Sequence, residues 1–212
     1  KFLTTGLSKE ADGSIRMDPG EFGLLPGLTE PDVLQSIQAL PGIKSIDETV
    51  SDINIRGGTN DQNLLLWDGI KMYQSGHFFG LISAFNPYLT QSVQVIKNGS
   101  SARYGDGVSG IISMQTFDQV ERTYFGGGGF NLISADIYSH IPITDRLAFQ
   151  VSARRSVTDF LNTPTYSQFS DRAFQDTQIT TPGRNATGQV SGREENFYFY
   201  DFSGKLLYDL TD

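Results

Sequence analysis

The most informative segment of this chain reads Asn98-Gly-Ser-Ser-Ala-Arg-Tyr-Gly-Asp-Gly-Val-Ser-Gly-Ile-Ile-Ser113. Within it, Gly105, Gly107 and Gly110 have the spacing G-x-G-x-x-G, which dinucleotide-binding proteins use between a strand and a helix. Residues 111–116 read Ile-Ile-Ser-Met-Gln-Thr, a composition that favours a strand. A strand offers no helix N-terminus to a phosphate group. We therefore expect the glycines to allow close backbone packing at a turn that leads into this strand.

The composition argues against several classes of function. The 212 residues carry a formal net charge of -8, which disfavours nucleic acid as a partner. The sequence has no cysteine, so disulfides, thiolate catalysis and zinc-thiolate sites are excluded. His77 and His140 lie far apart, and we expect no metal site and no cofactor. Because no apolar run approaches the roughly 20 residues of a membrane helix, any membrane span must be formed by strands.

Between about residues 25 and 118 the chain alternates short helix and strand signals, which predicts an α+β domain. A helix is expected with Thr29 as its cap, Pro31 in its first turn and an apolar face that continues to Leu40. Pro41-Gly42 then ends it. The predicted strands cover 53–55, 64–67, 70–73, 93–96 and 111–116, with a tight turn at Asp68-Gly69 and a short helix begun by Asn86-Pro87.

Beyond about residue 119 the helical signals stop and alternating segments begin. Apolar and polar side chains alternate in residues 133–141, in 147–157 and in 196–210. Two interpretations fit this pattern: a soluble sandwich with a buried apolar face, or a transmembrane barrel with lipid outside and a polar lumen. Tyrosines at both ends of the last segment favour the barrel, because aromatic residues form girdles at membrane interfaces.

The lengths of the connections also favour the barrel. Residues 143–146 form a short turn, whereas the connection at about 158–195 is long and polar. Outer-membrane barrels have short periplasmic turns and long extracellular loops. A first strand is then expected at about 121–128, with a tight hairpin at 129–131. Four strands leave open edges that lipid cannot satisfy, so we expect the chain to hold an incomplete barrel.

Several motifs in a fixed order carry a family resemblance. They are DVLQSIQALPGI at Asp32–Ile43, IRGG at Ile55–Gly58, LWDGI at Leu66–Ile70, and VQVIK at Val93–Lys97 followed by the glycine-rich segment. With them the chain resembles the plug domain and first barrel strands of TonB-dependent outer-membrane receptors. Residues 25–28 and 77–80 look like receptors from Bacteroidota. The predicted organisation is a lead segment at 1–24, a plug domain at 25–118 and the first strands of a transmembrane β-barrel at 119–212.

The resemblance implies a receptor in the outer membrane of a Gram-negative bacterium. It would bind a scarce solute, for which ferric siderophore is the commonest answer in the family, and import it to the periplasm. It would catalyse no covalent reaction and so would not be an enzyme. The implied partners are TonB with ExbB and ExbD, the remainder of the chain's own barrel, outer-membrane lipid and a small solute. Solute at the plug apex would shift the population of a state that exposes an N-terminal box to TonB.

The resemblance also implies a lock between plug and barrel. Arg56 and Lys97 match positions where two plug cations face barrel glutamates. The family commonly has arginine at the second position. A lysine cannot form the bidentate contact, so we expect a looser lock at Lys97.

The segment from Tyr73 to Gly80 is placed by the resemblance at the extracellular apex of the plug. Tyr73, His77 and Phe78, joined by Asn60 from a neighbouring loop, are the candidates for solute binding by stacking and hydrogen bonding. The alternative for the same segment is a packed turn without a ligand.

Two other functions stay open at this stage. One is a non-transporting binding or assembly module, in which the plug fold serves as a partner surface in a larger envelope complex. The other is a soluble β-sandwich hydrolase. Gly107-Val-Ser-Gly110 is one residue short of a nucleophile elbow, and no histidine base lies near it in the sequence.

Overall fold

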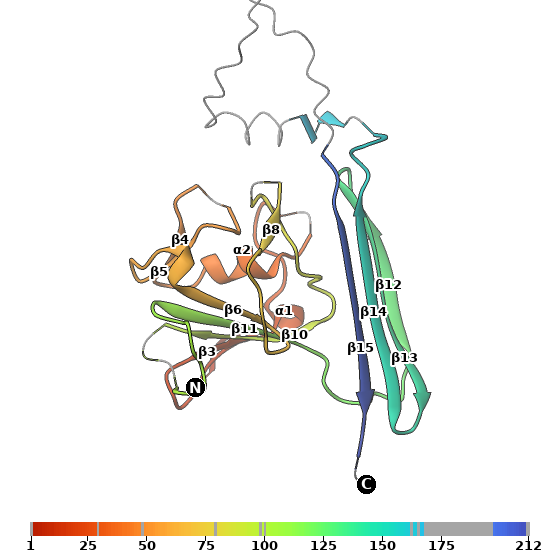
Figure 1. The fold of residues 1–212 in the computed structure, drawn as a ribbon, viewed down its shortest axis with the longest axis horizontal. Helices are drawn as coiled ribbons and strands as arrows, with labels where there is room; N and C mark the ends of the chain where they lie inside the picture. The colour runs from red at the N-terminus through yellow and green to blue at the C-terminus, as the bar shows by residue number, and fades with distance from the viewer. Residues whose placement is uncertain are drawn as a thin grey trace, which may run out of the picture.

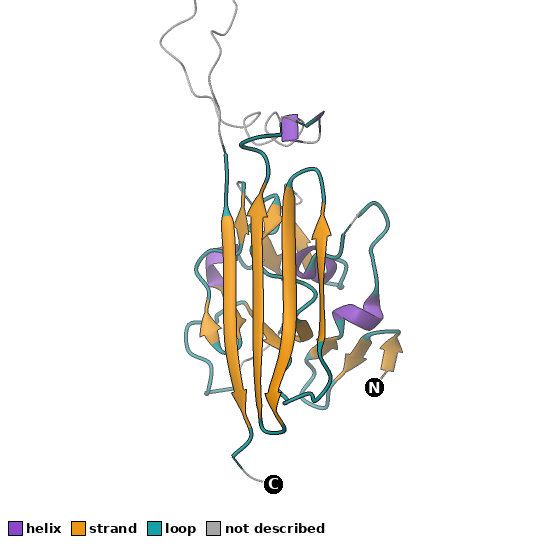
Figure 2. Ribbon diagram, turned by 90° about the vertical axis from the view of Figure 1, so that its right-hand side faces the viewer, coloured by secondary structure: helices purple, strands orange, loops and turns teal. Residues whose placement is uncertain are grey.

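The computed structural model describes residues 2–28, 30–47, 49–78, 80–97, 99, 101–161, 163–164, 166–167 and 197–210. An α+β part forms the N-terminal half, and a tall four-stranded sheet stands beside it (Figure 1). Seen from the side of that sheet, its long strands lie in front of the α+β part (Figure 2). Among these residues no helix combines the length and apolarity needed to cross a membrane.

The α+β part is built on a seven-stranded sheet with the order β1-β2-β3-β10-β11-β6-β7. Its strands are β1 (Phe2–Thr4), β2 (Leu7–Lys9), β3 (Ile15–Met17), β6 (Asn63–Trp67), β7 (Ile70–Lys71), β10 (Thr90–Ile96) and β11 (Gly110–Thr116). Two smaller sheets pair β4 (Ile43–Ser45) with β5 (Ile53–Ile55), and β8 (Gly76–His77) with β9 (Ile82–Ser83). The helices are α1 (Pro19–Phe22), α2 (Val33–Gln38) and the 3-10 turn η1 (Asn60–Gln62).

The predicted lead segment contributes strands to this sheet. β3 pairs with β10, where Met17 lies opposite Val93. Leu7, Ile15 and Met17 are buried in the core. Strands of three residues are too short to show a period in the sequence, so no elements were predicted in this segment.

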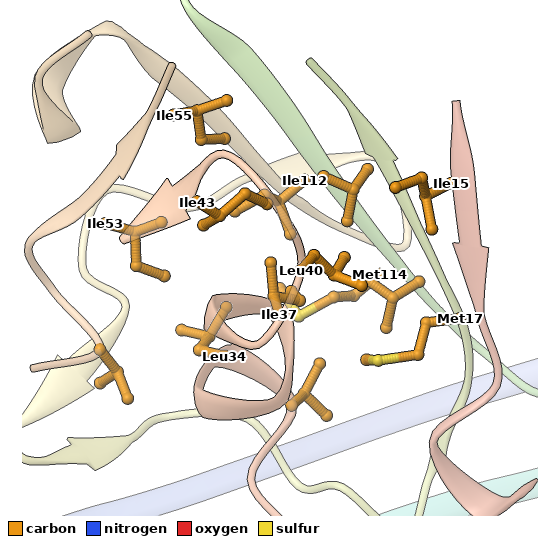
Figure 3. Packing of buried hydrophobic residues seen from close by; sticks show 14 of the residues in the cluster. Ile15, Met17, Leu34, Ile37, Leu40, Ile43, Ile53, Ile55, Ile112 and Met114 are labelled. Atoms are coloured by element: carbon orange, nitrogen blue, oxygen red, sulfur yellow. The ribbon is translucent and has the colours of Figure 1, made fainter. Parts of the chain in front are cut away.

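Helix α2 lies over the sheet and supplies one side of the core (Figure 3). Leu34 and Ile37 are completely buried and share one cluster with Ile112 and Met114 of β11. The spacing of Leu34 and Ile37 puts both on one helical face. Burying such side chains contributes roughly 1.5–3 kcal/mol each, so this helix is held mainly by packing.

Helix α2 begins later than predicted. Asp32 is its N-cap, and its carboxylate accepts a hydrogen bond from the Gln35 N–H at 3.0 Å. Aspartate caps a helix well because it satisfies an N–H that has no partner within the first turn. Pro31 therefore precedes the helix, and Thr29, the predicted cap, lies outside the described residues.

Two other local predictions were wrong. Asn86-Pro87 forms a turn and not a helix, because the Asn86 side chain accepts from the Tyr88 N–H at 2.9 Å and β10 already begins at Thr90. Strand β7 ends at Lys71 and does not reach Tyr73. The turn before it is as predicted, with left-handed φ angles of 49° at Asp68 and 81° at Gly69.

The second sheet has the order β12-β13-β14-β15 and is antiparallel throughout. Its strands are β12 (Phe125–Phe130), β13 (Ser134–Thr144), β14 (Leu147–Ser156) and β15 (Tyr200–Tyr208). The first hairpin turns later than predicted, since Gly129 still pairs with Asp136. Asn131 closes that turn by accepting from the Ile133 and Ser134 N–H groups. The predicted loop at about 158–195 lies largely outside the described residues.

In the second sheet many polar side chains are buried and many apolar side chains are exposed, which is the inverse of the pattern in a soluble domain. The buried side chains of β13 and β14 include Asp136, His140, Gln150, Ser152 and Ser156. The exposed side chains include Ile137, Ile141, Ile143, Phe202, Leu206 and Tyr208. The polar face is turned toward the α+β part and the apolar face away from it. The sandwich interpretation is therefore wrong for this sheet, whereas a strand with lipid on one side and a polar lumen on the other has this pattern.

The glycine-rich segment packs tightly at two of the three glycines of its G-x-G-x-x-G motif. A Cβ on Gly110 would lie 2.5 Å from Ile55 Cδ1, and one on Gly107 would lie 3.0 Å from Ile111 Cγ1. A Cβ on Gly105 would meet nothing within 4 Å. Residues 110–116 form β11, with no helix after the glycines. The expected close packing is thus present at Gly107 and Gly110 and absent at Gly105.

Candidate functional site

Asn60 and Tyr73 lie together on the α+β part. Both line a cavity of about 410 Å³, which Ser51, Lys71, Ser75 and Asp106 also line. The Asn60 side chain donates to the Ser51 carbonyl at 3.3 Å. The Tyr73 ring is 88% exposed, and Lys71 Nζ lies 5.0 Å from its centroid. An exposed aromatic ring beside polar groups can stack on a solute and bind its polar edge.

His77 and Phe78 lie elsewhere, against aromatic residues of the connection between β14 and β15. The His77 ring stacks on Phe199 with centroids 4.3 Å apart. Phe78 is buried and makes edge contacts with Phe197 at 4.4 Å and Tyr166 at 5.7 Å. The structure therefore divides the four predicted ligand residues into two pairs, with the His77 and Phe78 rings holding the β8–β9 hairpin to the connection that precedes β15.

Arg56 and Lys97 are close enough to repel one another. Lys97 Nζ donates to the Pro41 carbonyl at 2.7 Å. Burial lowers the pKa of Lys97, and the charges of Arg56 and Lys9 lower it further. The fold thus holds the charges of Lys97, Arg56 and Lys9 near one another. The lock with barrel glutamates stays a prediction.

A polar cluster joins the α+β part to the end of the sheet at Ser156 and Tyr200, which we call the loop end. Asp201 of β15 accepts from Arg154 of β14 at 2.6 and 2.9 Å and lies 2.5 Å from His77 Nε2. Arg154 also donates to the Ser83 carbonyl of β9. These four residues are named the loop-end cluster. Its one carboxylate binds a cation of the sheet and a histidine of the α+β part, so it bridges both.

A second cluster lies toward the opposite end of the sheet, at Thr144 and Leu147, which we call the turn end. Lys205 Nζ lies 3.3 Å from Asp68 Oδ2 and donates to Thr116 Oγ1 at 2.9 Å. Asp68 also accepts from the Thr116 N–H at 2.8 Å. Gln150 donates to the Phe117 carbonyl at 2.8 Å. These five residues are named the turn-end cluster.

Neither cluster was predicted from the sequence. The alternation puts Arg154, Asp201 and Lys205 at polar positions of their strands. It carries no information about which residues of a different domain lie opposite them. Asp68 was predicted only as a residue of a tight turn, but its carboxylate also forms an ion pair with Lys205.

A family comparison agrees with this architecture. Residues 28–111 match the family model described as TonB-dependent Receptor Plug Domain. The matched residues include α2, the strands β6, β7 and β10, and the cavity residues Asn60 and Tyr73, whereas β1, β2, β3 and most of β11 lie outside the match. We now call the α+β part the plug and β12–β15 the wall strands.

Solved structures of receptors and transporters are similar to the chain. The copper transporter OprC has 15% identity and a TM-score of 0.53, and the match covers 72% of this chain and 25% of that one. The ferric enterobactin receptor PfeA from Pseudomonas aeruginosa, a mutant form, has 20% identity and a TM-score of 0.48, with coverage of 70% and 25%. The FrpB iron transporter from Neisseria meningitidis has 17% identity and a TM-score of 0.41, with coverage of 61% and 22%.

These similarities concern the fold alone. The identity to OprC is too low to transfer a substrate. The chain spans about a quarter of the length of these solved structures. No curated protein matches the chain.

Proposed function

We propose that this chain is the plug and first wall strands of an outer-membrane receptor that binds a scarce solute and imports it into the periplasm. Import would take energy from TonB, driven by ExbB and ExbD. The observation that carries the proposal is the plug-family match at residues 28–111 beside strands whose polar face meets the plug and whose apolar face is exposed. A ferric siderophore is the proposed solute, and Bacteroidota the proposed origin.

An uptake assay tests this function. Cells that carry the full-length gene, cells that lack it and cells that lack TonB would be compared for growth on limiting iron, cobalamin or glycan. Uptake of ⁵⁵Fe-loaded siderophores would be measured in parallel. We expect a defect on one solute, equal in the two deletion strains. Normal uptake of every solute in both strains would contradict import and favour the binding or assembly module.

Lipid contact of the wall strands gives a prediction. Ile137 and Ile143 lie on the same exposed face of β13, the first near its middle and the second near its end. Ile137→Lys is expected to destabilise the folded barrel by about 2–4 kcal/mol, because a charge at the bilayer midplane is costly, and Ile143→Lys by about 0–1 kcal/mol. Unfolding of the full-length protein in lipid vesicles measures both. Equal small effects would contradict a membrane location, since both side chains would then face water.

Solute binding gives a further prediction. Tyr73→Ala and Asn60→Ala are expected to weaken binding of the imported solute at least tenfold without loss of folded protein, because both side chains line the same cavity. His77→Ala and Phe78→Ala are expected to loosen the β8–β9 hairpin as well, since their rings pack on Phe199 and Phe197 just before β15. Val108→Ala, at an exposed position, is the control. Unchanged affinity in Tyr73→Ala and Asn60→Ala would contradict a site in this cavity.

A further inference from the structure

Three charged residues lie side by side across the face of the wall strands that is turned toward the plug. Asp136 of β13 is directly opposite Arg154 of β14, and Arg154 is directly opposite Asp201 of β15. Directly opposite side chains on one face have Cβ atoms about 4.5–5.5 Å apart, so the long side chain of an arginine reaches either neighbour. The row therefore places one cation between two carboxylates.

Arg154 binds the neighbour on β15. Its guanidinium donates to Asp201 Oδ2 at 2.6 and 2.9 Å, and its Cζ atom lies 5.3 Å from the centroid of the Phe199 ring. The same guanidinium donates to the Ser83 carbonyl of the β8–β9 hairpin, and His77 of that hairpin lies against Asp201. The docked hairpin thus holds Arg154 on the side of Asp201.

Asp136, on the other side of Arg154, lacks a donor. The residue is 8% exposed, and its Oδ2 atom has no hydrogen-bond partner among the described residues. Buried carboxylate oxygens normally have a donor, because the desolvation of an unpaired charged group is costly. Arg154 is the residue directly opposite, and its guanidinium carries donors that match a carboxylate in geometry. Asp136 is thus positioned as a second acceptor for Arg154.

A third carboxylate whose charge acts on Arg154 is that of Asp32 in the plug. It is already occupied, because Asp32 is the N-cap of α2. Its Oδ1 atom accepts from the Gln35 N–H at 3.0 Å, and its Oδ2 atom accepts from the Ser83 N–H at 3.3 Å. Asp136 Oδ2 has no such partner in the part of the chain that the structure describes, so Asp136 is the better alternative for the guanidinium.

We propose that Asp136 is an alternative partner of Arg154, to which the arginine moves when the β8–β9 hairpin separates from the wall strands. Separation removes the Ser83 carbonyl from Arg154 and His77 from Asp201. Asp201, with 22% of its side chain exposed, is then open to water, whereas Asp136 stays more deeply buried and attracts the cation more strongly. The arginine therefore keeps a carboxylate in both positions of the hairpin.

This exchange of partners makes release of the hairpin easier. A buried cation that lost its carboxylate would raise the free energy of the separated state, and Asp136 prevents that loss. The docked and separated positions of the hairpin thus form a two-state element whose balance depends on a residue of β13. The exchange requires neither TonB nor a solute, so it stands apart from the proposed import.

Amide hydrogen exchange of the full-length receptor in lipid vesicles, without solute or TonB, tests the proposal. It is measured for residues 76–83 under conditions in which the rate reports the population of the separated hairpin. Asp136→Asn retains the size of the side chain and removes its charge. We expect this variant to exchange at least threefold more slowly than wild type, because Arg154 then has no carboxylate to move to. Equal or faster exchange overturns the proposal, since a residue that merely supports the wall would have that effect when lost.

A background without the arginine shows whether the effect passes through Arg154. Arg154→Gln removes the cation that changes partners, so the addition of Asp136→Asn to it should leave the exchange rate of residues 76–83 unchanged. A similar slowing by Asp136→Asn with and without Arg154 overturns the proposal, because the effect would then have another cause.

Asp201→Asn gives the opposite starting point. In the docked state of this variant Arg154 has lost its carboxylate, and separation allows it to bind Asp136, so exchange should be at least tenfold faster than in wild type. The addition of Asp136→Asn should make exchange at least threefold slower than in Asp201→Asn alone. Equal or faster exchange in the double variant overturns the proposal, since the two substitutions would then each weaken the interface.

Asp136→Glu and Asp159→Asn are the controls. Asp136→Glu retains the carboxylate, and Asp159→Asn removes one that pairs with Arg155, which lies on the opposite face of β14 from Arg154. Both should exchange like wild type, and a slowing in either overturns the proposal. Heat-modifiable migration on gels verifies that each barrel is folded, and Asp136→Ser replaces Asp136→Asn if the latter gives no barrel. Failure of both to fold would show that the docked state needs the carboxylate, which also overturns the proposal.

Discussion

Gly110→Ala is expected to destabilise the plug by about 2–3 kcal/mol, the cost of overpacking a core that cannot relax. The added methyl group would lie 2.5 Å from Ile55 Cδ1 and 3.0 Å from Ile55 Cγ2. Ile55 is completely buried within the cluster that contains α2 and β11, so it has no space to move into. β11 is the strand that joins β10 to β6, and its displacement would disturb the centre of the sheet.

The matched control for this prediction is Gly105→Ala. It belongs to the same G-x-G-x-x-G segment, but its added methyl group would meet no atom within 4 Å. Amide hydrogen exchange of β11 in the full chain measures both variants. We expect exchange in Gly110→Ala to be faster by at least tenfold and exchange in Gly105→Ala to match wild type. Similar rates in the two variants would show that steric contact with Ile55 does not explain the glycine.

Asp201→Ala is the second change with a large expected effect. Asp201 and Arg154 are largely buried, with side-chain exposures of 22% and 14%. Removing one partner of a buried pair leaves the other charge without compensation, which costs several kcal/mol in a dry interior and about 2 kcal/mol at this partial exposure. His77 loses its carboxylate as well. We expect the β8–β9 hairpin to separate from the wall strands, with hydrogen exchange in residues 76–83 faster by at least tenfold.

The control for Asp201→Ala is Asp159→Ala. Asp159 pairs with Arg155 at 2.6 Å, four residues away and on the opposite face of β14 from Arg154. That arginine is 42% exposed, and such exposed pairs contribute about 0–1 kcal/mol. Exchange in residues 76–83 should therefore be unchanged in Asp159→Ala. A similar effect of the two substitutions would contradict a specific role of the loop-end cluster.

Local patterns predicted much of the plug. The turn at Asp68-Gly69 needs left-handed backbone at both positions, and strands β5, β6, β10 and β11 follow β-branched and aliphatic runs, so neighbours in sequence suffice to identify them. The cap of α2 was misplaced because Thr29, Pro31 and Asp32 are all acceptable near a helix start. Tertiary packing selects Asp32, whose carboxylate also accepts from the Ser83 N–H.

The candidate site was less predictable. Tyr73 and Asn60 line one cavity, whereas the rings of His77 and Phe78 pack on Phe199 and Phe197 just before β15. Tyr73 and His77 are four residues apart, and in a loop this spacing does not determine the directions in which the two side chains point. The partners of His77 are distant in sequence, with Asp201 in the last strand. Such contacts exist only after the plug has docked on the sheet.

The sequence determined the elements of this protein: the periods of strands and helices, the turns, and the rejection of a phosphate site after Gly110. Each of these depends on neighbouring residues, because backbone conformation and side-chain direction are local properties. The tertiary structure alone decided which face of the alternating strands is buried and which charges meet across the interface. Apolar and polar side chains alternate along a strand in the same way in a sandwich and in a barrel. The burial of the polar face against the plug distinguishes them, since burial is a property of the whole fold.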